Sequence, residues 1–304
     1  MLFVLPKLTK VFQAMFAVLK SFKVLGPLVT LGSMSISIWA YSYSLGWKLA
    51  SLFILLLLLH ELGHVIACRR IGLKASAPLF IPFIGALIFA PNDMDREEES
   101  YVGYGGPLLG TIASLFVWML WWLIPSHPPL LLTASFIGMF LNLFNLIPLH
   151  PLDGGRILQS VGRWIQWVGI AILAVITLLM KDPGMLYLWL IVMTDFRFKH
   201  RRYWMILVFL IMTTGLLWGL GSEHQTVVYT YIIFGALLCV LAFAVESEGK
   251  PIIHRPAQPR KRAWFWFAAY ALLAFFLLTS MWFQSKQLEA LDITKKEIPA
   301  PQVQ

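Results

Sequence analysis

The stretch LFILLLLLHELGH, residues 52–64, places two histidines and a glutamate inside a long apolar run. His60 and His64 are four residues apart, so a helix would carry both on one face, where two imidazoles can bind one metal ion. Glu61 lies beside them and is a candidate general base for a metal-bound water. Ionisable groups at membrane depth are costly, so these side chains need a functional or pairing explanation. The motif predicts metal-dependent hydrolysis inside or at the edge of a bilayer.

Apolar residues make up 59% of the 304-residue chain, and charged residues only 13%. This composition excludes a soluble globular domain and predicts an all-α polytopic membrane protein. Most candidate spans approach the ~20 apolar residues that a helix needs to cross the hydrocarbon core, but the run 184–195 is short. We expect about 8–9 transmembrane helices, with candidate spans at 28–47, 49–67, 102–124, 130–148, 164–180, 184–195, 203–221, 226–245 and 264–283.

The net charge of +9 comes from 24 Lys and Arg residues against 15 Asp and Glu residues. If the N-terminus is cytoplasmic and all nine segments cross, 19 of the 24 basic residues are cytoplasmic and 5 are outside. The positive-inside rule favours this topology, so the basic residues are interpreted as anchors near anionic lipid and not as a nucleic-acid site. We therefore expect a multi-pass protein of a prokaryotic plasma membrane, with a cytoplasmic N-terminus.

Three regions differ in composition along the chain. Residues 1–26 carry four lysines near one helical face. This pattern predicts a basic amphipathic segment on the cytoplasmic leaflet, although an ordinary basic flank of the first span explains it equally well. Residues 27–158 hold the candidate chemistry and form the expected catalytic core. Residues 159–304 form an expected C-terminal transmembrane region with a short external tail, whose role stays open.

The apolar stretch 77–91 is too short to cross the membrane, and its three prolines disfavour a regular helix. We predict a re-entrant segment or a small β-hairpin that turns near Gly85. Non-helical backbone at membrane depth is tolerated only against protein or a wet cavity, which places this segment beside the candidate site. A peripheral hydrophobic loop is the alternative.

A catalytic zinc ion needs a third protein ligand and an open fourth position. The segment NLIPLHPLDGG, residues 145–155, offers Asp153 at the predicted cytoplasmic end of a span. The helix of the first motif runs toward the same leaflet, so topology brings Asp153 toward His60 and His64. The alternative is that Asp153 only caps the helix that follows. His150 could compete as a ligand, but it precedes a proline, and a loop or supporting role suits it better.

Together, HELGH at 60–64 and NLIPLHPLDGG at 145–155 resemble the site-2 protease family of intramembrane zinc metalloproteases. The resemblance covers about a third of the chain, and the two motifs stand in the family's order on apolar helices. It implies one Zn²⁺ per chain and assigns roles to four residues. The implied metal ligands are His60, His64 and Asp153, and the residue that activates water is Glu61.

The same resemblance gives a role to Asn145, which matches the family's asparagine ahead of the Pro-x-x-Pro-Leu-Asp-Gly segment. That amide is thought to steady the substrate or the developing oxyanion, which a hydrogen-bond donor can do. Helix–helix hydrogen bonding explains Asn145 nearly as well, and it explains Asn142 better.

The resemblance implies a zinc metalloendopeptidase that hydrolyses peptide bonds of transmembrane substrates near the cytoplasmic leaflet, as in regulated intramembrane proteolysis. Single-span membrane proteins within the lipid bilayer are the expected substrates, and a regulatory partner is compatible with this function. The family's hairpin between the motifs, which fits 77–91, could pair with an unwound substrate. The first alternative is a non-proteolytic metal-binding scaffold, although such a site has no need of Glu61. A transporter is the second, although no internal repeat is evident.

Overall fold

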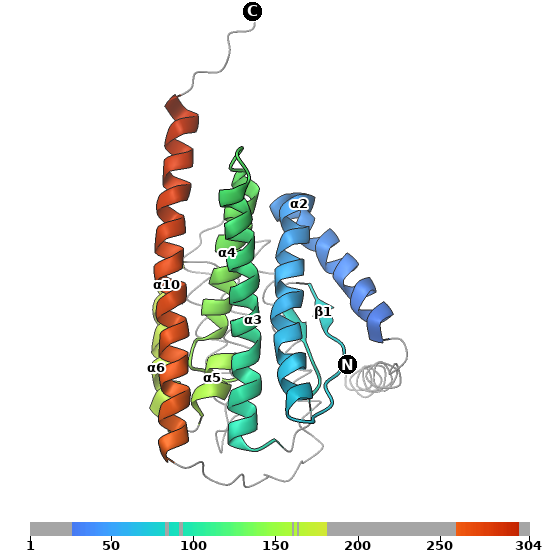
Figure 1. The fold of residues 1–304 in the computed structure, drawn as a ribbon, viewed down its shortest axis with the longest axis vertical. Helices are drawn as coiled ribbons and strands as arrows, with labels where there is room; N and C mark the ends of the chain where they lie inside the picture. The colour runs from blue at the N-terminus through green and yellow to red at the C-terminus, as the bar shows by residue number, and fades with distance from the viewer. Residues whose placement is uncertain are drawn as a thin grey trace, which may run out of the picture. The chain divides into compact units, whose positions relative to one another are not determined.

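A computed structural model describes residues 26–82, 85–90, 94–159, 161–162, 164–180 and 260–297 (Figure 1). The described part is mostly helical, as predicted, and three of its helices are long and apolar enough to cross a membrane: 26–70, 96–123 and 262–291. The expected total of about 8–9 transmembrane helices stays a prediction. The spans predicted at 184–195, 203–221 and 226–245 lie outside the described residues, as does the basic segment apart from Gly26.

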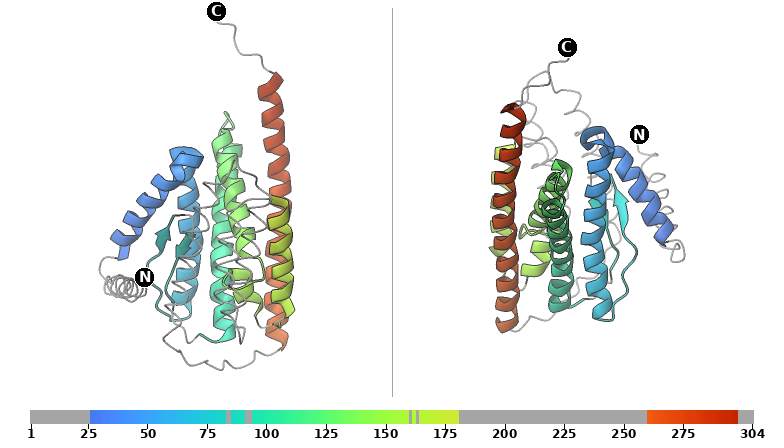
Figure 2. Two further views of the ribbon diagram at one scale, coloured as in Figure 1. Left: turned by 180° about the vertical axis from the view of Figure 1, so that it is seen from behind. Right: turned by 45° about the horizontal axis from the view of Figure 1, so that its top comes forward.

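Helix α2 (Gly26–Arg70) carries the first motif and is broken at Gly46, whose φ of 72° and ψ of 153° are not helical. Glycine adopts a positive φ without the steric cost that a Cβ brings, so the chain can bend there. The bend lies two residues before the predicted junction between the first two spans, which we expect at 28–47 and 49–67. Figure 2 shows the two arms of α2 diverging from it. We call residues 26–45 the N-terminal arm and residues 47–70 the motif arm.

Strands β1 (Leu79–Ile81) and β2 (Gly85–Leu87) pair in antiparallel fashion, with Phe80 opposite Ala86. The structure therefore contains the predicted hairpin. The strands lie between the two arms of α2 (Figure 1). The Phe80 side chain packs against Ile54 and Leu57 of the motif arm, one turn before His60. The hairpin is thus beside the candidate site, and the alternative of a peripheral loop is wrong.

Helix α3 (Arg96–Leu123) begins with a capping box between Asp95 and Glu98. The Asp95 carboxylate accepts the backbone N–H of Glu98, and the Glu98 carboxylate accepts the backbone N–H of Asp95. This exchange satisfies two backbone donors and defines where the helix starts. Helix α3 packs against α2 on one side and against α4 (Pro129–Asn145) on another.

The segment after α4 turns into the short helix α5 (Asp153–Leu158), which packs on α3. The last described helix, α10 (Arg260–Glu297), packs against α4, α5 and α3, and Figure 1 shows it on the side of α3 away from α2. Helix α6 (Trp164–Met180) coincides with the span predicted at 164–180. The described residues within 24–148, 152–165 and 255–304 form one compact unit, and the candidate site lies within it.

Candidate metal centre

The three predicted ligands lie together, although Asp153 is about ninety positions from the histidines in sequence. The Nε2 atoms of His60 and His64 are 3.3 Å apart, and Oδ2 of Asp153 is 3.2 Å from each of them. All three residues are buried. A tetrahedral zinc ion with bonds of about 2.0–2.1 Å holds its ligand atoms about 3.3–3.4 Å apart. The two nitrogens and one carboxylate oxygen therefore fit the predicted zinc ion in both type and spacing.

Asp153 is the first residue of α5, and its side chain turns toward the histidines. The N-cap of α5 is Leu152, and no side chain caps this helix. The alternative in which Asp153 merely caps the following helix is therefore wrong. The other carboxylate oxygen, Oδ1, lies 3.6 Å from Nη1 of Arg156, one turn along α5. Arg156 thus supplies positive charge on the side of the carboxylate that faces away from the imidazoles.

The charge state of Asp153 follows from its neighbours. Burial raises the pKa of its carboxyl, but in the metal-free site the charges and hydrogen bonds of the imidazolium forms of His64 and His60 outweigh burial and hold that pKa well below its usual range. Asp153 is therefore an anionic candidate ligand at neutral pH. A metal ion bound to the neutral imidazoles would supply the positive charge in place of their protons and would keep the carboxylate ionised.

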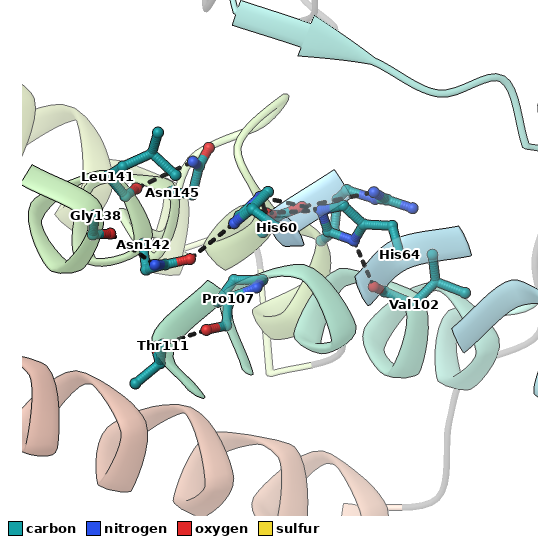
Figure 3. A network of polar contacts seen from close by, with 11 residues as sticks. His60, His64, Val102, Pro107, Thr111, Gly138, Leu141, Asn142 and Asn145 are labelled. Atoms are coloured by element: carbon teal, nitrogen blue, oxygen red, sulfur yellow. Dashed lines mark hydrogen bonds and ion pairs between the residues drawn. The ribbon is translucent and has the colours of Figure 1, made fainter. Parts of the chain in front are cut away.

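Each histidine also makes a hydrogen bond through Nδ1, the ring nitrogen that faces away from the ligand cluster (Figure 3). Nδ1 of His60 lies 2.8 Å from Oδ1 of Asn142, and Nδ1 of His64 lies 2.7 Å from the backbone oxygen of Val102. The Asn142 amide orientation is supported independently, because its Nδ2 donates to the Gly138 oxygen at 2.7 Å. Both partners are acceptors, so each Nδ1 carries the hydrogen and each Nε2 offers its lone pair. The two rings are preset as metal ligands.

Glycines of α3 allow this helix to approach the side chains of the candidate site closely. A Cβ built on Gly106 would lie 2.2 Å from Nε2 of His64, and one on Gly110 would lie 2.2 Å from Oδ1 of Asn142. A Cβ on Gly63 of the motif arm would meet the Gly105 oxygen at 2.2 Å. Small residues let membrane helices approach closely, and here they let α3 pass directly beneath the imidazoles.

Glu61 adjoins His60 on the motif arm and is buried, with 7% of its surface exposed. Asn145 is not joined to the ligand cluster by a hydrogen bond from its amide nitrogen. Its Nδ2 donates to the Leu141 oxygen of its own helix at 3.1 Å (Figure 3). The predicted role of Asn145 toward substrate stays a prediction. His150 is not one of the three residues whose ligand atoms lie together.

Two supports of the site escaped the sequence analysis. The Val102 carbonyl is a backbone group, so no residue type signals it. The glycines of α3 did leave a signal, because Gly103, Gly106 and Gly110 recur at helical spacing. For Asn142, the interpretation as a helix–helix hydrogen bond is confirmed, and its partner is His60, one of the candidate metal ligands.

Known proteins similar in sequence to this chain include zinc metalloproteases, which agrees with the zinc-type geometry of the cluster. Residues 126–179 match the model of Peptidase family M50, a segment that includes Asp153 but not the histidine motif. The chain is 37% identical over 118 residues to a zinc metalloprotease of Methanocaldococcus jannaschii, covering 37% of this chain and 34% of that protein. It is 28% identical over 106 residues to the stage IV sporulation protein FB of Bacillus subtilis, covering 34% and 37% respectively.

A longer match joins the chain to a probable chloroplastic zinc metalloprotease of Oryza sativa subsp. indica, with 24% identity over 237 residues. That match covers 60% of this chain and 40% of the relative. The chain thus spans between about a third and two fifths of the length of these relatives. The predicted resemblance to zinc metalloproteases is confirmed, and so is zinc as the expected cofactor, for which the structure offers a group of residues that could hold a metal ion.

Proposed function

We propose that this protein is a zinc endopeptidase that hydrolyses peptide bonds of transmembrane substrates within the bilayer. The observation that carries the proposal is the buried cluster of His60, His64 and Asp153, in which both histidines are oriented by hydrogen bonds at Nδ1. Zinc bound there would polarise a carbonyl and lower the pKa of its water to ~7. The adjacent Glu61 favours a hydrolase over a scaffold, because a structural site needs no base.

The protein's own groups account for the proton transfers. The Glu61 carboxylate accepts a proton from the attacking water and then delivers it to the leaving amine nitrogen. Burial of the ligand cluster limits competing water, so charges inside the site are weakly screened. Asn145 would steady the scissile carbonyl, in keeping with the family resemblance, by donating from its amide.

The hairpin suggests how a substrate is presented. Phe80 N–H donates to Ser33 Oγ at 3.1 Å, and the Pro78 oxygen accepts from Thr30 Oγ1 at 2.6 Å. The N-terminal arm of α2 therefore occupies the outer edge of β1. We assign the substrate to the edge of β2, where an unwound segment can pair through its backbone. Such pairing would expose a scissile carbonyl that a substrate helix keeps in its own hydrogen bonds.

We further propose that cleavage occurs near the cytoplasmic leaflet of a plasma membrane. Arg69 and Arg70 close the last turn of α2, eight residues beyond Glu61 or about 12 Å along the helix. The asymmetry of basic residues favours a cytoplasmic N-terminus and a cytoplasmic end for this helix. Single-span membrane proteins are the proposed substrates, and a regulatory partner is compatible with the arrangement.

The test compares wild type with Glu61→Gln, both purified with zinc and reconstituted with candidate single-span proteins. We expect equal zinc content but cleavage only by wild type, because the variant loses the base and keeps the ligands. Membrane proteomics of cells that express each form would then identify substrates that accumulate with the variant. Equal cleavage by both forms would exclude the proposed mechanism. Zinc binding without cleavage by either form would favour the scaffold alternative.

A further inference from the structure

Helix α10 is joined to the metal-site unit by polar contacts as well as by apolar packing. Its side chains Trp266, Leu273 and Leu277 belong to one buried cluster with Leu146 and Ile157. Polar contacts with the core lie along its length. They are Arg262 to Glu97, Tyr270 to Leu146, Gln284 to Ser135 and Gln287 to Trp118. A helix docked only by apolar packing would have no need of such contacts.

One of these contacts reaches the turn that leads to the third ligand. The Tyr270 hydroxyl donates to the backbone oxygen of Leu146 at 2.7 Å. Leu146 is the C-cap of α4 and is buried, with 1% of its surface exposed. The last carbonyls of a helix have no partner within the helix, and an unpaired carbonyl in a bilayer is costly. Tyr270 therefore supplies a donor that α4 cannot provide for itself.

The same oxygen lies against α5 on its other side. A Cβ on Gly154 would come within 2.1 Å of the Leu146 oxygen, so only glycine permits this approach. Gly154 directly follows Asp153 in the first turn of α5. The Leu146 carbonyl is thus held between the Tyr270 hydroxyl and the backbone that carries the carboxylate ligand. A shift of this carbonyl must move the first turn of α5 or open a gap beside it.

We propose that Tyr270 is a positioning residue of the metal centre, acting through the Leu146 carbonyl on Asp153. This role would give α10 an indirect effect on metal affinity, in addition to its packing against the other helices. Ser100 supports α5 from the opposite end, where its Oγ donates to the Ile157 oxygen at 3.0 Å. With α5 held at both ends, Oδ2 of Asp153 keeps its position 3.2 Å from both Nε2 atoms. The inference rests on the proposed zinc site.

The test uses the full-length protein in detergent and the variant Tyr270→Phe, which keeps the ring and removes only the hydroxyl. We expect the zinc dissociation constant, measured by chelator competition, to rise about 5-fold, as loss of one hydrogen bond implies. The visible absorption of the Co²⁺-loaded protein should also change, because it reports ligand geometry directly. Gly154→Ala displaces the same carbonyl from the other side and should change the same absorption more strongly.

The matched control is Gln287→Leu, which removes the 2.9 Å hydrogen bond from Trp118 Nε1 to Gln287 Oε1. This bond also joins α10 to the core, but it lies seventeen residues, or about 25 Å along the helix, from Tyr270. We expect an unchanged zinc affinity and Co²⁺ spectrum. Equal changes of zinc affinity and Co²⁺ spectrum in Tyr270→Phe and Gln287→Leu would show a general effect of docking α10 and overturn the role of Tyr270. An unchanged affinity and spectrum in Tyr270→Phe would overturn it as well. If wild type itself binds no zinc, the proposed function fails instead.

Discussion

Oδ1 of Asn142 lies 2.8 Å from Nδ1 of His60, so a residue of α4 orients a candidate metal ligand of α2. Removal of a hydrogen-bond partner of a metal ligand costs about 10–100-fold in metal affinity or activity. We therefore expect Asn142→Leu to weaken zinc binding by that factor, because His60 loses the acceptor that fixes its tautomer. Chelator competition on the purified protein measures the effect.

Asn145→Leu is the matched control, since it removes the same amide three residues away. Its Nδ2 donates only within α4, to Leu141 at 3.1 Å, so zinc affinity should stay at the wild-type value. If Asn145 assists the substrate as proposed, kcat should fall while zinc content is unchanged. Equal zinc loss in the two variants would contradict the distinct roles assigned to these asparagines.

Gly106→Ala tests the close approach of α3 to the metal site. The added Cβ would lie 2.2 Å from Nε2 of His64, so either the imidazole or the helix must move. Overpacking of this kind costs about 1–3 kcal/mol of stability, and here it also displaces a ligand atom. We expect strong loss of bound zinc, measured by elemental analysis. Gly32→Ala, where a Cβ meets nothing within 4 Å, should keep its zinc.

The hairpin can be loosened without touching the metal site. Thr30→Val combined with Ser33→Ala removes the hydrogen bonds that join the N-terminal arm to Pro78 and Phe80. At about 1 kcal/mol each, these losses should raise KM several-fold and leave zinc content unchanged. Ser35→Ala is the control, because its Oγ bonds only the Leu31 oxygen of its own helix. A normal KM in the double variant would argue against presentation of substrate by the hairpin.

Much of this site could be predicted from the sequence because its chemistry is local. His60 and His64 share a helical face through their spacing alone, and the three prolines of 77–91 disfavour a regular helix through their own covalent structure. Asp153 required one further step, since topology places two distant segments at one leaflet. These inferences depend on residue type and spacing, which the sequence displays directly.

The supports of the site depend instead on tertiary packing. His64 is held by the Val102 carbonyl, which every residue type possesses, so only the path of α3 reveals the contact. Tyr270 is 117 residues beyond Asp153, and nothing in its local sequence distinguishes it from an interfacial aromatic. Asn142 and Asn145 occupy the same helix end, and the rotation of α4 decides which one faces His60. Side-chain pattern alone does not determine that rotation.

The lowered pKa of Asp153 predicts how zinc affinity depends on pH. Its pKa lies below the usual carboxyl range, so its contribution as an anionic ligand is present above that range and is lost only as pH falls through the lowered pKa. Between pH 5 and 8 Asp153 should therefore bind no proton, and any fall in zinc affinity toward acid must come from protonation of the imidazoles. Asp153→Asn removes the charge but keeps the shape. Loss of a hydrogen-bond partner of a ligand weakens metal binding about 10–100-fold. We expect Asp153→Asn, which alters the ligand itself, to raise the zinc dissociation constant by more than that.

Infrared difference spectra of the metal-free protein, wild type minus Asp153→Asn, separate this assignment from its competitor. A pH profile of zinc affinity does not, because removal of the carboxylate also removes an anion that favours the imidazolium forms of His60 and His64. If Asp153 stays ionised, the difference spectrum should show no C=O band of a protonated carboxyl from pH 8 down to pH 5. Such a band, appearing toward acid in wild type and absent from Asp153→Asn, would contradict the assignment. Arg156→Gln, which removes the cation 3.6 Å from Oδ1, tests the source of the effect. Because His64 and His60 are the main groups that lower the pKa, this variant should also lack the band.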